Sequence, residues 1–164
     1  MGTICLLLFL LALWKSPLIN QLVYLTYLGN QLSAFTCYFT YYLASTNPTP
    51  IPKIQAKGKL FIALFALEYS LVIQVLIVLV YWLLIFDEIL ENVLAKNDTV
   101  IYLLTILIHT LPFLAALSNC LATHFTFVKS HYLYCFIIAL IYFPLNYLGT
   151  QIKGRPVYPF LRWE

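Results

Sequence analysis

The chain has 164 residues, of which 63% are hydrophobic and 9% are charged, and its formal net charge is +3. Soluble domains carry about 25% charged residues, so this composition excludes a soluble domain and predicts one integral membrane domain over residues 1–164. The small positive charge forms no dense basic cluster, so we expect no nucleic-acid partner. The four cysteines lie in or beside apolar segments without a metal-ligand spacing, and we expect them to pack as small hydrophobic side chains.

The first two apolar segments differ in polarity. Residues 1–14 are short for a span and end at a Lys-Ser-Pro sequence, which predicts a short N-terminal helix or a tilted anchor. Residues 18–45 are long enough to cross a membrane but carry several polar side chains. Thr26, Asn30 and Ser33 are spaced to share one helix face. Polar residues help membrane helices to pack, so we expect this face to look into a helix bundle.

A proline-rich loop separates these segments from the next one. Residues 46–59 contain three prolines within five residues, which predicts a loop. Residues 60–86 form the next predicted span, and residues 87–98 a short acidic connection. The span carries Glu68 about two turns inside, where a carboxyl group needs a proton or a polar partner. Two interpretations stay open: a hydrogen bond between helices from a protonated carboxyl, or a place in a functional pocket.

The fourth segment, residues 99–121, has no formally charged side chain. At about 1.5 Å per residue, a helix of this length crosses the roughly 30 Å hydrocarbon core of a membrane. His109 lies near its middle. An ionisable group at membrane depth is costly, so His109 is a hypothesis for function by default.

The predicted fold is therefore an all-α integral membrane protein. It is a bundle of four transmembrane helices plus a short N-terminal helix, with spans over residues 18–45, 60–86, 99–121 and 131–149. A C-terminal tail follows over residues 150–164. The other two histidines, His124 and His131, lie near segment ends, and we expect them in water or at the membrane interface.

Thr26 is a candidate partner of His109, because the two lie at similar depths in segments that enter from the same side. Thr26 is eight residues into its segment and His109 ten residues into its own, which corresponds to about 12 and 15 Å from one face. A hydroxyl beside an imidazole is the minimum arrangement for nucleophilic attack with histidine as the base. The alternatives are ordinary hydrogen bonds, from the imidazole to a backbone carbonyl and from the threonine to its own helix.

Three motifs in order along the chain resemble a known family. They are YLTYL at Tyr24–Leu28, HTLPF at His109–Phe113 and VYPFL at Val157–Leu161. The Tyr81-Trp82 pair ahead of the acidic connection also fits. Over residues 18–161 the chain resembles the androgen-induced and androgen-dependent TFPI-regulating protein family, which are multispan membrane hydrolases.

The resemblance implies hydrolysis of fatty acid esters of hydroxy fatty acids, in an endomembrane such as the endoplasmic reticulum. It implies Thr26 as the catalytic nucleophile and His109 as the base, membrane lipids as partners, and no metal or organic cofactor. The motifs supply no clear oxyanion donor. Asn30, one turn from Thr26, is a candidate for that role, and Glu68 is a candidate for the pocket.

An alternative function stays open. Animal members of the family carry extra residues between the histidine and the Leu-Pro pair, and a further span after the VYPFL motif, whereas three residues follow Leu161 here. The alternative is a non-catalytic structural subunit of a larger complex with other membrane proteins as partners, which would suit the mitochondrial inner membrane. A lipid-binding protein that uses the same cavity is a third interpretation.

Overall fold

The computed structural model describes most of the chain as helices. The described residues are 18–46, 58–94, 99–123, 127–158, 160, 161 and 163, with four single positions near the N-terminus. The expected N-terminal helix over residues 1–14 and the proline-rich loop lie largely outside these residues, as does His124. Within the described ranges every regular element is helical, as the composition predicts.

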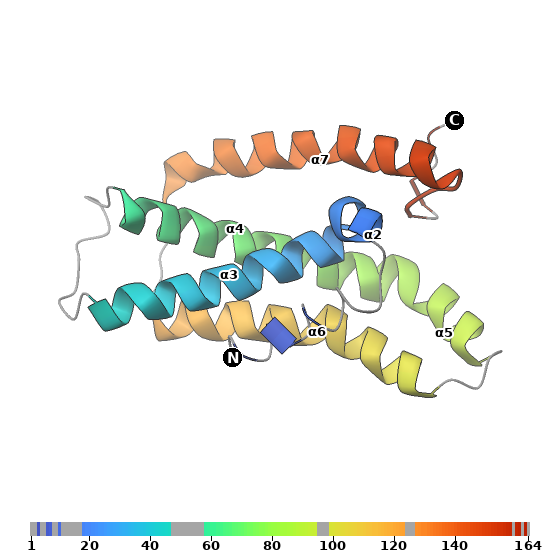
Figure 1. The fold of residues 1–164 in the computed structure, drawn as a ribbon, viewed down its shortest axis with the longest axis horizontal. Helices are drawn as coiled ribbons and strands as arrows, with labels where there is room; N and C mark the ends of the chain where they lie inside the picture. The colour runs from blue at the N-terminus through green and yellow to red at the C-terminus, as the bar shows by residue number, and fades with distance from the viewer. Residues whose placement is uncertain are drawn as a thin grey trace.

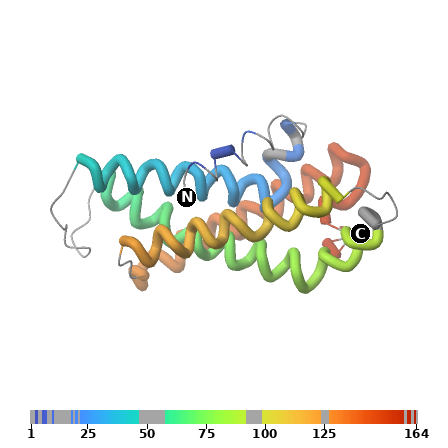
Figure 2. The backbone as a smooth tube through the Cα atoms, turned by 90° about the horizontal axis from the view of Figure 1, so that it is seen from below, coloured from blue at the N-terminus to red at the C-terminus, as the bar shows by residue number. Residues whose placement is uncertain are grey.

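Three long helices form the centre of the molecule. They are α3 (Leu25–Thr46), α4 (Lys59–Val80) and α6 (Thr99–Ala122), which contact one another and lie side by side in two perpendicular views (Figures 1 and 2). Gly29 of α3 lies against α4, and a Cβ atom there would collide with the side chain of Ile77. Glycine therefore lets α3 and α4 approach closely, as small residues do between membrane helices.

The α4 helix continues beyond its predicted end. It passes through a π-helical turn, η2 (Tyr81–Ile85), into α5 (Phe86–Leu94). The expected acidic connection over residues 87–98 is therefore wrong as far as Leu94. Asp87 and Glu88 are among the first residues of α5, inside the continuous helix Lys59–Glu91. The acidic residues mark the start of a helical turn and not a loop.

Among the described residues, three helices are long and apolar enough to cross a membrane: Lys59–Glu91, Thr99–Ala122 and Lys129–Lys153. They correspond to three of the four predicted spans and agree with an integral membrane protein. The segment over residues 18–45 is not among them. It forms two helices, α2 (Leu18–Val23) and α3, and its polar side chains make it less apolar than the others.

The polar side chains of α3 point into the bundle, as the spacing of Asn30 and Ser33 predicts. Ser33 Oγ lies 2.9 Å from Ser70 Oγ of α4. The side-chain amide of Gln74 donates to Ser33 Oγ at 2.9 Å and to Asn30 Oδ1 at 3.2 Å. All four side chains are buried. Because each has a polar partner, these polar side chains of α3 lie inside the bundle and not toward lipid.

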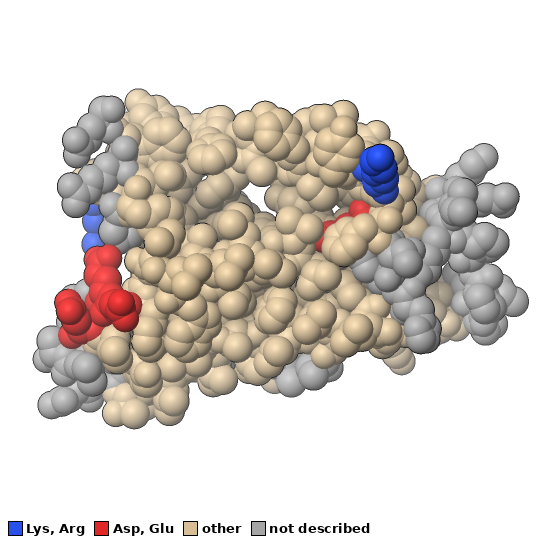
Figure 3. Space-filling view, turned by 180° about the vertical axis from the view of Figure 1, so that it is seen from behind, with Lys and Arg blue, Asp and Glu red and all other residues tan. Residues whose placement is uncertain are grey.

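The last helix, α7 (Tyr132–Lys153), follows the short 3₁₀ turn η3 (Lys129–His131) and lies beside the three central helices (Figure 1). It packs on α2 near its C-terminal end, where a Cβ atom on Gly149 would lie 2.6 Å from Val23 Cγ1. Asn146 and Gly149 are its buried residues. The surface is hollowed beside α7, and most of the central band of that face carries no charge (Figure 3). The loose packing leaves room between α7 and α4.

Candidate active site

The helix of the second segment is interrupted at Tyr24. The hydroxyl of Tyr142 on α7 donates to the carbonyl oxygen of Val23 at 2.9 Å. The backbone N–H of Leu25 donates to the hydroxyl oxygen of Tyr158 in the tail, also at 2.9 Å. Side chains that insert into the backbone hydrogen bonds of a helix bend or break it. The two tyrosines therefore account for the break without a glycine or a proline, and a new helix starts at Leu25.

Thr26, in the first turn of α3, meets His109 of α6. Thr26 Oγ1 lies 3.3 Å from His109 Nε2, and His109 Nδ1 lies 2.7 Å from the carbonyl oxygen of Thr105, one turn earlier on α6. A carbonyl oxygen only accepts, so Nδ1 carries the proton and Nε2 keeps a lone pair for the threonine hydroxyl. The structure brings together the pair that depth matching predicts. Sequence reasoning did not identify Thr105 as the group that orients His109. The signal for it is the spacing of four residues, which places Thr105 one helical turn before His109.

Tyr81 stacks on the imidazole of His109. The two ring centroids are 4.0 Å apart and the ring planes differ by 9°. Tyr81 is fully buried and opens the π-helical turn η2, a type of turn that is frequent at functional sites. Its hydroxyl has no hydrogen-bond partner among the residues that the structure describes. The ring stack and the Thr105 hydrogen bond together fix the plane of the imidazole.

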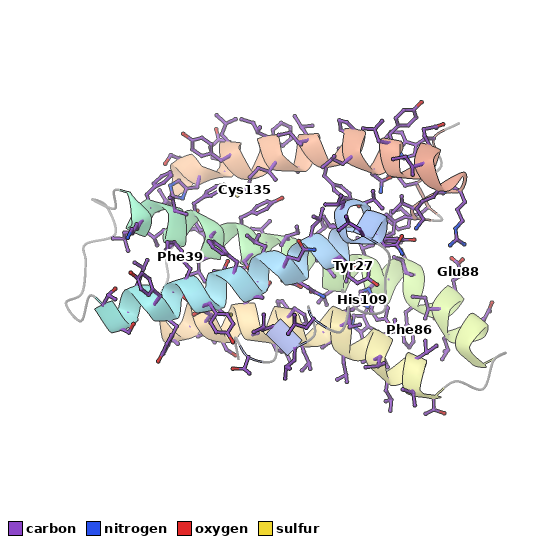
Figure 4. The ribbon with its side chains drawn as sticks, viewed as in Figure 1. Tyr27, Phe39, Phe86, Glu88, His109 and Cys135 are labelled. Atoms are coloured by element: carbon purple, nitrogen blue, oxygen red, sulfur yellow. The ribbon has the colours of Figure 1, made fainter. Side chains whose placement is uncertain are left out.

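Two cavities meet at Thr26 and His109. One, of about 210 Å³, lies between α4 and α7 and has mainly apolar walls. The other, of about 320 Å³, is lined by Asn20 and Tyr24 and by residues of α5 and α6, and is more polar. Tyr27 also lines the polar cavity, and Figure 4 labels it on α3 and His109 on α6, the helix below α3 in that view. The pair therefore has an apolar chamber on one side and a polar chamber on the other.

Tyr158 of the VYPFL motif lines both cavities. It is buried, and its hydroxyl accepts the Leu25 N–H and lies near the side-chain hydroxyls of Tyr142 and Thr26. Burial raises the pKa of Tyr158 well above its usual range, so the hydroxyl stays protonated at physiological pH. The motif could be recognised in the sequence. Its position near Thr26 could not be predicted, because the two are more than 130 residues apart along the chain.

Asn30 is not positioned as an oxyanion donor, because both ends of its side-chain amide bond to neighbouring helices. Its amide nitrogen donates to the carbonyl oxygen of Ile108 at 3.3 Å, and its amide oxygen accepts from Gln74 at 3.2 Å. It lines neither cavity. Asn30 therefore joins α3 to α4 and α6 next to His109, and does not reach the space where a substrate carbonyl would lie.

Glu68 lies away from the pair. Its carboxylate accepts from the backbone N–H of Val128 at 2.7 Å and lies 2.6 Å from His131 Nδ1. Glu68 is 1% exposed and His131 is 5% exposed. The expectation that His131 is in water is therefore wrong, because the carboxylate holds the imidazole inside the bundle. Glu68 lines neither cavity, so the structure does not place it in the pocket.

No group of three or more His, Cys, Asp or Glu side chains in the described ranges could hold a metal ion. A scan of the chain against protein-family models gave no match, and searches of curated proteins and of solved structures gave none either.

Proposed function

We propose that the chain is a membrane hydrolase of lipid esters, with Thr26 as nucleophile and His109 as base. The observation that carries this proposal is the arrangement of Thr26, His109 and Thr105, which matches the order of nucleophile, base and orienting group. A separation of 3.3 Å between hydroxyl and imidazole is common in unliganded sites and shortens when substrate binds. The motif resemblance supports fatty acid esters of hydroxy fatty acids as the substrate class.

In the first half of the reaction, His109 Nε2 takes the proton of the Thr26 hydroxyl as its oxygen attacks the ester carbonyl carbon. The resulting tetrahedral intermediate collapses, the bond to the leaving alkoxide breaks, and His109 returns the proton to that oxygen. The products are a free hydroxy fatty acid and an acyl group on Thr26. The Nδ1 bond to Thr105 holds the imidazole in the tautomer that this step needs.

In the second half, water enters from the polar cavity and His109 takes its proton. Hydroxide attacks the acyl-Thr26 carbonyl, the new tetrahedral intermediate releases the fatty acid, and the proton returns to Thr26. The apolar cavity between α4 and α7 suits an acyl chain, since its walls are mainly hydrocarbon. The hollow beside α7 offers an entry from the bilayer (Figure 3).

Two groups near Thr26 suit the developing negative charge. Thr26 is in the first turn of α3, where the helix dipole is positive. The hydroxyl of Tyr158 lies near Thr26 and also contacts the hydroxyl of Tyr142, so it would have to turn from Tyr142 to donate to an oxyanion. Preorganised hydrogen-bond donors that face an oxyanion make one of the greatest contributions to the rate of acyl transfer. We assign the oxyanion role to Tyr158 in place of Asn30.

We also propose that α3 is the fourth span of the bundle. Its 22 residues, at about 1.5 Å each, cover about 33 Å, which matches the hydrocarbon core. It packs against α4 and α6, and its polar groups are bonded inside. An endoplasmic reticulum location follows from the motif resemblance.

Hydrolysis itself tests the proposal. The natural chain in lipid nanodiscs is incubated with a fatty acid ester of a hydroxy fatty acid, and released fatty acid is measured by mass spectrometry. We expect release well above that of nanodiscs with the Thr26→Ala chain. Equal release of fatty acid by the natural chain and by Thr26→Ala would contradict the proposal.

Changing Tyr158 to Phe is expected to lower kcat about 10²-fold, the usual cost of removing one oxyanion donor. KM should change little, because the ring stays in place between Tyr24 and Phe160. Tyr147→Phe is the matched control, since Tyr147 is exposed on α7, and its kcat should equal that of the natural chain. A Tyr158→Phe chain with natural kcat would show that the hydroxyl does not stabilise the oxyanion. Its role would then be to accept the Leu25 N–H at the helix break.

The second candidate function is a structural subunit of a membrane complex. It is favoured by α7, whose side chains are exposed along most of its length. A mild detergent extract separates the two functions. A subunit should migrate with a large assembly on a native gel, whereas the free hydrolase should migrate as a small monomer or dimer.

A further inference from the structure

The last turn of α7 places Lys153 against two residues that line the polar cavity. Its ammonium nitrogen lies 2.8 Å from Asn20 Oδ1 and 2.8 Å from Tyr24 Oη. The same nitrogen lies 4.2 Å from the centroid of the Tyr24 ring. Asn20 and Tyr24 both line the polar cavity, and Thr26 lines it too. A cation is therefore held by two of the residues that line the same cavity as Thr26.

No carboxylate lies among the contacts of Lys153 with the described part of the chain. The buried carboxylate of Glu68 interacts with the Val128 N–H and with His131. An ammonium has three N–H donors, of which two are directed at Asn20 and Tyr24, so one remains for a further acceptor. The plain structural role of Lys153 is to join α7 to α2 and to complement the C-terminal dipole of α7.

We propose that Lys153, with Asn20 and Tyr24, binds the free carboxylate of an acyl lipid whose ester group reaches Thr26. This subsite rests on the proposed function and adds to it the residues that bind the carboxylate of the substrate. A single ammonium with neutral neighbours suits a singly charged carboxylate better than a phosphate, which favours several donors or the fork of an arginine. The carboxylate lies at Lys153, the ester at Thr26, and the second acyl chain in the apolar cavity.

Photo-crosslinking measures this subsite without requiring turnover. The Thr26→Ala chain in phosphatidylcholine nanodiscs is irradiated with a diazirine-bearing palmitic acid, with its primary amide, or with the corresponding alkyl phosphate. The pH is kept where the acid is ionised, and cross-linked peptides are quantified by mass spectrometry. A hydrogen bond to a charged group is worth about 1.5–3 kcal/mol, so we expect the acid to label cavity peptides at least about 10-fold more than the amide.

Substitutions of Lys153 in the Thr26→Ala chain distinguish carboxylate binding by Lys153 from a purely structural link between α7 and α2. Lys153→Gln should bring the ratio of acid to amide labelling close to one, and Lys153→Arg should recover most of the preference. Lys129→Gln, which removes a charge from the exposed turn before α7, should keep the natural ratio.

An unchanged ratio of acid to amide labelling in Lys153→Gln would overturn the subsite. Lys153 would then only join α7 to α2. Stronger labelling by the phosphate than by the acid would overturn the carboxylate assignment. Failure of hydrolysis in the natural chain, with the acid preference intact, would overturn the proposed function alone.

Discussion

Replacing His109 by alanine is expected to lower kcat at least about 10³-fold, with little change in KM. General-base catalysis contributes about 10²- to 10⁴-fold, and His109 is the imidazole in contact with Thr26. Ester hydrolysis in nanodiscs at saturating substrate measures the effect. More than a tenth of the natural kcat in His109→Ala would show that another group takes the proton.

Thr26→Ala and the double variant distinguish a working pair from two separate contributions. Residues that act as a unit are strongly non-additive, so the double variant should be about as inactive as either single one. Thr40→Ala is the matched control on the same helix, because the Thr40 hydroxyl bonds to Thr36 and Asn119, away from both cavities. It should keep natural activity.

Replacing Glu68 by alanine is expected to lower the free energy of unfolding by about 3 kcal/mol or more. Breaking a buried pair leaves the remaining group uncompensated, which costs about 3–5 kcal/mol. Here the substitution also strands the Val128 N–H and the imidazole of His131, which is packed between Phe61 and Phe65. Unfolding in mixed detergent micelles, followed by tryptophan fluorescence, measures the change.

The control for Glu68 is Glu91→Ala, because Glu91 is exposed on α5. It should change the free energy of unfolding by less than about 0.5 kcal/mol. A Glu68→Ala chain as stable as Glu91→Ala would mean that the carboxylate does not hold η3 onto α4.

The sequence was sufficient for features that depend on local pattern and on length. Apolar runs predicted three of the long helices, and residue counts from the segment ends predicted that Thr26 and His109 lie at similar depths. The inward face of α3 follows from the spacing of Asn30 and Ser33. These features need only the helical rise and period.

Features that depend on distant contacts were not predictable. The break at Tyr24 arises from tyrosines more than 110 residues away along the chain, and no glycine or proline marks it. The burial of His131 depends on Glu68, 63 residues earlier. Each pairing is one choice among many polar residues at similar depths, and the pattern of hydropathy does not distinguish them.

The central claim is that Thr26 is an activated nucleophile, and a fluorophosphonate probe tests it most directly. The natural chain, Thr26→Ala, His109→Ala and Thr40→Ala are labelled in native membranes, and the modified peptide is identified by mass spectrometry. We expect label on Thr26 in the natural chain and in Thr40→Ala, and none in the other two. Absence of label on the natural chain, while a serine hydrolase added to the same membranes reacts, would contradict the claim.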